Sequence, residues 1–220
     1  MTIQDDLTPD EEKRRDCLVK MLTAGALTMT PLGIVQSAWW GSTPDKLPDS
    51  KSIFSLEGDV RVNGSKADLA TRIGGGDVVS TSKNSEVVFA VGSDSFIMRS
   101  NSQMEIEGGG FFIDTLRLLS GSLLSVFGER NANQALNVNT TTATIGIRGT
   151  GIYMEAEPDL TYLCTCYGTV AMTSALDPND TEVVTATHHD APKYLSNKAI
   201  RGTHVRNHTF DILLLDLLLP

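Results

Sequence analysis

Short segments rich in β-branched and aromatic residues, each closed by glycine or another turn-forming residue, recur along most of this sequence. Such segments at intervals of about 8–12 residues predict an all-β domain, built as a sandwich or roll, a barrel or a β-solenoid. The β domain is expected to cover residues 52–175. The predicted strands are 52–58, 59–64, 85–92, 95–100, 103–108, 111–121, 122–128, 135–140, 142–149, 151–157, 160–168 and 169–174.

Apolar and polar residues alternate within several of these segments, as they do in a strand with one buried and one solvated face. Met104 and Ile106 alternate with Glu105 and Glu107. No internal segment keeps the roughly 3.6-residue period of a helix. The two glutamates therefore lie on one solvated face, which is a more ordinary role for acids in a strand than a catalytic carboxylate pair.

Composition excludes several classes of protein. The chain has 220 residues, 18 Lys and Arg against 27 Asp and Glu, a formal net charge of −9 and three cysteines. An acidic chain without a long basic block is not expected to bind nucleic acid. Three cysteines are too few for a disulfide scaffold, and apolar segments along the whole length exclude disorder. The chain carries no catalytic motif, so we expect a protein that is not an enzyme.

The first forty residues differ from the rest. Acidic residues 1–12 precede the basic cluster Lys13-Arg14-Arg15, and the uncharged, weakly apolar segment 21–40 follows. This order is typical of an export signal, and KRRDCLVK resembles a twin-arginine signal, with small residues before Ala38 for cleavage. The alternative is an inner-membrane anchor, because 21–40 is just long enough to span a bilayer. We expect an exported, periplasmic protein with a signal helix or anchor in 1–38 and a linker in 39–51.

Four stretches of the β domain carry a resemblance to the FecR domain family: 76–108, 116–128, 142–157 and 161–172. The most specific string is Ile147-Arg148-Gly149-Thr150-Gly151. The resemblance implies an exported regulatory domain made of β-strands, in a family named for a membrane protein that relays iron-dicitrate signals to an anti-sigma and sigma factor pair. Here only twelve residues, five of them acidic, precede the basic cluster, too few for a sigma-binding module, so direct sigma-factor binding is not expected.

The same string has a physical interpretation of its own. Gly149 and Gly151 flank Thr150 and allow positive φ and a sharp reversal between strands. Arg148, on the polar side, is suited to fasten this turn through carbonyl groups or a carboxylate. No helix start or lysine follows, so a phosphate-binding loop is not supported.

Two cysteines and the histidines that follow them form a candidate metal site. Cys164 and Cys166 are two residues apart in a predicted strand, so both side chains face one way together with Tyr162. Thiolates and imidazoles suit Zn²⁺ or copper, and two of each can also hold an iron–sulfur cluster. The candidate ligands are Cys164, Cys166, His188, His189 and His208.

Other interpretations of these residues stay open. The cysteines can be small apolar core residues, or a redox pair in an oxidising compartment, although so small a disulfide ring is strained. The histidines can be exposed polar residues of a tail. We expect such a tail at 176–220, ending in the apolar segment 212–220, which is too short to span a membrane and suited to packing on the body or docking to a partner.

These features together predict an exported FecR-type domain that binds a ligand or a membrane or envelope partner protein and holds a metal ion. One alternative is a redox accessory protein that depends on a metal or a cluster. A second alternative is a structural envelope domain.

Overall fold

The computed structural model describes residues 51–128, 136–187, 190–196 and 199–202. These residues form fourteen β-strands and no helix, which confirms the predicted all-β fold. The described part of the chain therefore holds no helix that could cross a membrane. The predicted export signal or anchor in 1–38 lies outside the described residues. The strands are β1 Ile53–Glu57, β2 Val60–Val62, β3 Ser65–Lys66, β4 Val78–Thr81, β5 Glu86–Val91, β6 Asp94–Met98, β7 Gln103–Gly109, β8 Phe112–Val126, β9 Leu136–Asn139, β10 Ala143–Ala156, β11 Leu160–Ser174, β12 Thr181–Ala186, β13 Asp190–Ser196 and β14 Ala199–Gly202.

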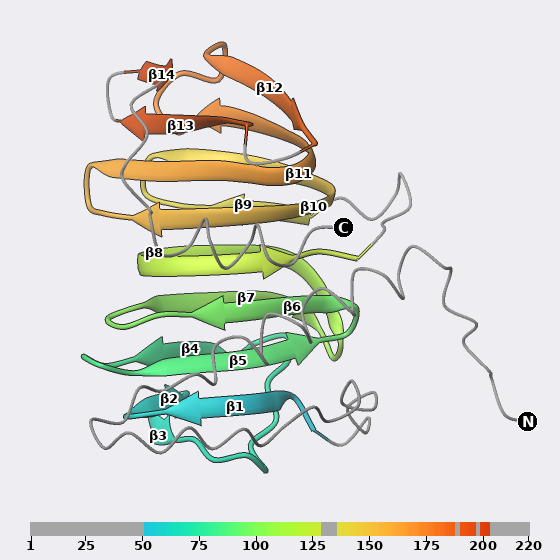
Figure 1. Cartoon of the computed structure of the whole chain (residues 1–220), viewed down its shortest axis with the longest axis vertical. Helices are drawn as coiled ribbons and strands as arrows, with labels where there is room; N and C mark the ends of the chain where they lie inside the picture. The colour runs from blue at the N-terminus through green and yellow to red at the C-terminus, as the bar shows by residue number, and fades with distance from the viewer. Residues whose placement is uncertain (1–50, 129–135, 188–189, 197–198, 203–220) are drawn as a thin grey trace, which may run out of the picture. The chain divides into compact units, whose positions relative to one another are not determined.

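The strands pack as two layers, which we call sheet I and sheet II. Sheet I has the order β1–β5–β6–β8–β10–β11–β13–β14. Sheet II has the order β3–β2–β4–β7–β8–β9–β10–β11–β12. Among the described strands only β8 and β9 pair in parallel. Sheet I lies in front in Figure 1, where β4 and β9 are paler behind β5 and β10.

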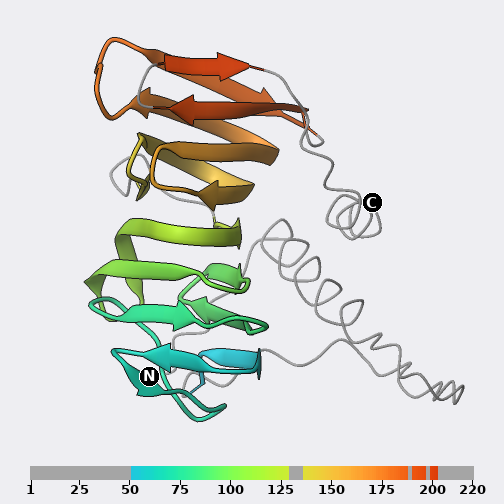
Figure 2. The ribbon, with the colours of Figure 1, turned by 90° about the vertical axis from the view of Figure 1, so that its left-hand side faces the viewer.

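Three long strands belong to both sheets because each folds back at a glycine. The first half of β8 pairs with β7 in sheet II, and its second half pairs with β6 in sheet I. Gly121, between the halves, has φ 84°, and a Cβ there would lie 2.5 Å from the Cα of Ser102, so only glycine fits. In Figure 2, β8 is a continuous yellow-green band running from one layer to the other. Strands β10 and β11 cross near Gly149 and Gly168 in the same way.

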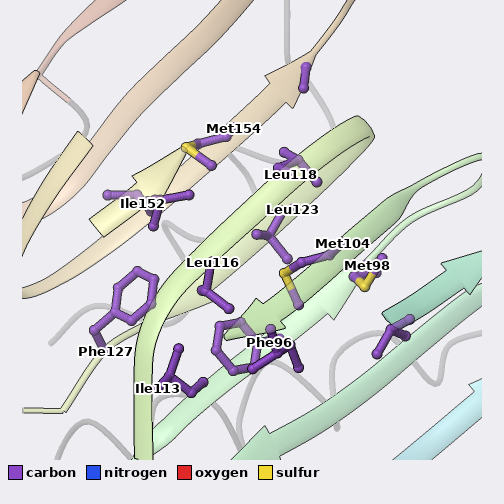
Figure 3. Close-up of a cluster of buried hydrophobic side chains, with 14 of the residues drawn as sticks. Phe96, Met98, Met104, Ile113, Leu116, Leu118, Leu123, Phe127, Ile152 and Met154 are labelled. Atoms are coloured by element: carbon purple, nitrogen blue, oxygen red, sulfur yellow. The ribbon is translucent and has the colours of Figure 1, made fainter. Parts of the chain in front are cut away.

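The hydrophobic core fills the space between the sheets. Figure 3 shows side chains of β6, β7, β8 and β10 that converge there. Phe96 packs against Phe89, with ring centroids 5.1 Å apart, and edge-on against Phe127, at 6.0 Å. All three side chains are fully buried. Because β8 and β10 supply side chains to this core from both sheets, removing one large core residue is expected to loosen the two layers together, at a cost of about 3–5 kcal/mol for a phenylalanine.

One end of the sheets, which we call the loop end, carries the turn at 92–93, the β7–β8 turn and two of the strand crossings. A Cβ on Gly92 would lie 2.4 Å from the carbonyl oxygen of Phe111. At the crossings, the Phe127 N–H donates to the carbonyl of Thr150 over 3.0 Å. This is the end toward which β5 points, on the right in Figure 1.

The β-sheet structure continues beyond residue 175, after which the sequence pattern predicts a tail. Strand β12 extends sheet II, and β13 and β14 extend sheet I. An ion pair joins the two additions, because Lys193 Nζ lies 2.5 Å from Glu182 Oε1. Asp180 Oδ2 also accepts a hydrogen bond from the Ile200 N–H at 2.9 Å. Among the described residues, strands thus continue to Gly202, past the predicted boundary at 175–176.

Candidate functional site

The two cysteines lie in β11, just before this strand crosses from sheet I to sheet II. Cys164 pairs with Tyr153 of β10, whereas Cys166 is the extra residue of a β-bulge, because its two neighbours pair with successive residues of β10. Cys164 is half-buried and Cys166 is 2% exposed. Tyr162 and Cys164 share the outer face of sheet I, as the alternation predicts. The bulge interrupts that alternation before Cys166. The period of two therefore does not place the Cys166 side chain on the face of Tyr162 and Cys164, as was predicted.

Strand β13 brings the polypeptide that follows the histidine pair next to the cysteines. Asp190, the first residue of β13, pairs with Thr165, the residue between the two cysteines. Ala186, the last residue of β12, pairs with Gly168. The connection 187–189 therefore begins and ends beside the cysteine-bearing part of β11. This long-range pairing is independent of the sequence spacing on which the metal-site prediction was based.

The histidines themselves lie outside the described residues; they are His188, His189, His204 and His208. Among the described residues no three His, Cys, Asp or Glu side chains gather closely enough to hold a metal ion. Within that part of the chain, neither Cys164 nor Cys166 forms a disulfide bond. The five-residue ligand set thus stays a prediction, and so does the redox pair.

Three tyrosines line the sheet face beside Cys164. The rings of Tyr153 and Tyr162 meet edge-on with centroids 6.3 Å apart, and those of Tyr162 and Tyr194 at 5.2 Å. The Tyr153 hydroxyl donates a hydrogen bond of 2.8 Å to Glu155 Oε1. Burial raises the pKa of the Tyr162 hydroxyl well above its ordinary value, and negative charge at Cys164 adds to this. Tyr162 therefore stays protonated at neutral pH.

Of these three tyrosines, only Tyr162 was predicted from the strand alternation to lie on the face of Cys164. Tyr153 and Tyr194 join it because β10 and β13 flank β11, with Tyr153 opposite Cys164 and Tyr194 opposite Tyr162. The available signal was the period of two within β10, where Tyr153 and Glu155 fall on one face. The pairing of strands that brings three tyrosines together is not readable from local pattern.

Residues 148–151, the string most specific for the family resemblance, cross between the sheets opposite the cysteine bulge. Gly149 has φ 55°, and Gly151 pairs with Tyr167, one residue beyond Cys166. Thr150 is fully buried and Arg148 is exposed. The chain reverses its direction here by passing from sheet II to sheet I, while the strand pairing continues on both sides. Residues 148–151 of β10 and the Cys-x-Cys segment of β11 therefore lie on neighbouring strands, at the point where both cross between the sheets at the loop end.

No family model matches this sequence, and no curated protein matches it. In three dimensions the chain is similar to two crystal structures of a candidate anti-sigma factor from Parabacteroides distasonis ATCC 8503, at 1.65 and 2.50 Å resolution. The sequences are 11% and 12% identical, and the TM-score is 0.48 in both cases. The similarity covers 58% of this chain and 59% of that chain, less than two thirds of either.

Proposed function

We propose that this chain is an exported FecR-type regulatory domain, without catalytic activity, that binds a ligand or a membrane or envelope partner and holds a metal ion at its loop end. The metal ligands are the thiolates of Cys164 and Cys166 and imidazoles supplied by 188–189, with His208 as a further candidate. The predicted export signal and the family resemblance support the compartment and the regulatory class. Neither nucleic acid nor a sigma factor is a partner in this proposal.

The observation that carries the metal site is the pairing of Asp190 with Thr165. Adjacent Cα atoms along the chain are about 3.8 Å apart. The backbone of His189 is therefore one peptide away from a residue that pairs between the two cysteines. A histidine side chain reaches several ångströms from its Cα, which is the scale of a Zn–N and Zn–S ligand sphere. Two thiolates and two imidazoles would complete a tetrahedral zinc site; copper or an iron–sulfur cluster uses the same donors.

A closed four-ligand site would have a structural role in this position. It would tie the connection between β12 and β13 to the crossing of β10 and β11, and so join the last strands of both sheets. Metal binding of this kind contributes directly to folding free energy. A regulatory surface built on the loop end would then depend on the metal without any chemistry occurring at the metal.

The test uses the full chain purified from the compartment in which it accumulates. We expect about one zinc, copper or iron per chain, and loss of that metal in the Cys164→Ser/Cys166→Ser double variant. Cys17→Ser is the matched control, because it also removes a thiol but lies in the predicted signal; its metal content should not change. His188→Ala/His189→Ala should weaken zinc binding at least about tenfold, because losing even a group that only orients a ligand costs about 10–100-fold in affinity.

Metal-free protein whose two thiols react at the same rate with and without added Zn²⁺ would overturn the metal site and leave the cysteines as core residues. A reversible two-electron oxidation of Cys164 and Cys166 in metal-free protein would favour the redox accessory function instead. If neither metal nor oxidation alters stability or partner binding, the structural envelope domain is the better interpretation.

A further inference from the structure

The turn between β7 and β8 presents two adjacent phenylalanines to solvent. Phe111 is 50% exposed and Phe112 is 62% exposed, among the most exposed large apolar side chains of the described residues. The next residue, Ile113, is buried in the core. Scattered apolar residues are ordinary on protein surfaces, but neighbouring phenyl rings at the tip of a hairpin form an apolar projection of the kind that marks a contact site.

This projection is held in place by its neighbours. The Gly75 N–H donates to the carbonyl of Gly110 over 3.0 Å. Gly92, in the turn between β5 and β6, has no Cβ, and this lets the carbonyl of Phe111 approach its backbone closely. The guanidinium carbon of Arg72 lies 5.4 Å from the centroid of the Phe111 ring, in a cation–π contact. These contacts hold the backbone of the turn on two sides, so little backbone entropy remains to be lost when the turn binds.

The described polypeptide also begins and ends toward this end. Ser52 precedes β1; its carbonyl accepts a hydrogen bond of 2.9 Å from the Ala90 N–H, next to the turn at 92–93. Strand β14 runs back toward the loop end, since Ala199 pairs with Ser196 and Gly202 with Lys193. In the sequence, the predicted linker 39–51 precedes Ser52, and the apolar segment 21–40, the candidate membrane anchor, comes before that linker. With that anchor in a bilayer, the polypeptide would enter the β domain at its loop end.

We propose that the Phe111–Phe112 turn is a membrane-contacting element that places its phenyl rings at the boundary of headgroups and acyl chains. Phenylalanine and leucine are suited to that depth, and the Arg72 guanidinium beside the ring is suited to a lipid phosphate. The fitting surface is zwitterionic, because the chain has a net charge of −9 and the exposed Asp114 follows the turn. This goes beyond the proposed function and does not depend on the metal site.

The test follows a single tryptophan in the full chain. The two native tryptophans are replaced in a Trp39→Phe/Trp40→Phe background. Phe112→Trp then places the reporter on the turn with little change in apolarity. Leu176→Trp is the matched control, because Leu176 is 68% exposed in the turn between β11 and β12, at the opposite end of the sheets. Both chains are mixed with phosphatidylcholine vesicles whose acyl chains carry bromine, a contact quencher of tryptophan fluorescence.

With the reporter at 112, we expect a blue shift and quenching at least about fivefold stronger than at 176, since only a side chain at the acyl boundary meets the bromine atoms. The quenching should survive added salt, because apolar burial is not screened. Equal quenching at the two positions, or none at 112, would overturn the proposal. A blue shift at 112 that grows with protein concentration in the absence of vesicles would also overturn it, and would indicate docking to a second copy.

Discussion

The outer faces of the two sheets differ, although the same three long strands build both. On sheet I, a row across four strands joins Val88, Ile97, Leu124 and Tyr153, each opposite the next. All four are at most 8% exposed, yet none belongs to the core cluster between the sheets. On sheet II, the corresponding row is Glu105, Arg117, Asn139 and Thr144. These side chains are half-buried or exposed.

The sequences of the strands already show this difference between the two outer faces. In β7 the pattern of 103–107, QMEIE, alternates strictly, because one face meets the core and the other meets water. In β5 the apolar residues Val87, Val88 and Phe89 are consecutive and all buried. The second half of β8 is similar, with residues 123–126 buried throughout. Within β8, the half with alternating burial therefore has its outer face in water, and the half with continuous burial has its outer face buried.

The largest expected effect comes from placing the same charge on both faces. Leu124→Asp puts a carboxylate on the buried face of sheet I and should lower the free energy of unfolding by roughly 3 kcal/mol or more, since an unpaired buried charge is strongly disfavoured. Thr144→Asp, on the exposed face of sheet II, should change it by no more than about 1 kcal/mol. Urea unfolding of the two variants measures the difference. Equal losses would mean that the faces do not differ in solvation.

Much of the fold could be predicted from local sequence, because β-branched residues favour strands and glycine permits the turns between them. The predicted strands 142–149 and 151–157 are the two halves of β10, and 160–168 and 169–174 are the two halves of β11. What the pattern could not show is that pairing continues through each glycine, because that depends on the neighbouring strand. The strands after residue 175 were missed for a related reason: polar composition hides short strands at the edges of a sheet.

The candidate site, too, could be predicted only in part from the sequence. The period of two placed Tyr162 and Cys164 on one face correctly. The bulge at Cys166 could not be predicted, since a bulge is a property of two paired strands and not of one. The pairing of Asp190 with Thr165 joins residues 25 positions apart, and no local signal encodes it. Sequence alone therefore supplied the candidate ligands, whereas the strand pairing shows that Asp190 lies beside the segment that carries the two cysteines.

A smaller effect, on the pH dependence of stability, is expected from Tyr162, because this residue lies on the buried outer face of sheet I. Its pKa in the folded chain is raised above the ordinary value of 10.0, mainly by burial. Both states keep the proton below pH 10, so the contribution of Tyr162 to stability is complete there. Above pH 10 the unfolded chain loses the proton first, so stability falls by up to about 1.4 kcal/mol per pH unit.

Tyr162→Phe should remove that part of the alkaline slope while leaving the folded chain intact, since the phenyl ring keeps its packing against Tyr194. Urea unfolding between pH 8 and pH 11, at intervals of about half a pH unit, compares the two chains. Identical slopes would show that the Tyr162 hydroxyl is as well solvated in the folded chain as in the unfolded one, and sheet I would then lose its buried character at this position.

The smallest effect is expected on sheet II, at the ion pairs of Arg117. Its Nη1 lies 3.5 Å from Glu105 Oε2 and 4.0 Å from Glu107 Oε1, and about half of its side chain is exposed. Arg117→Met keeps most of the apolar stem and removes the charge, so the free energy of unfolding should fall by less than about 1 kcal/mol. In high salt the difference should vanish, because exposed charges are screened. A loss that persists in high salt would mean that the Arg117 guanidinium makes contacts that salt does not screen, and that this face of sheet II is less solvated than its exposure indicates.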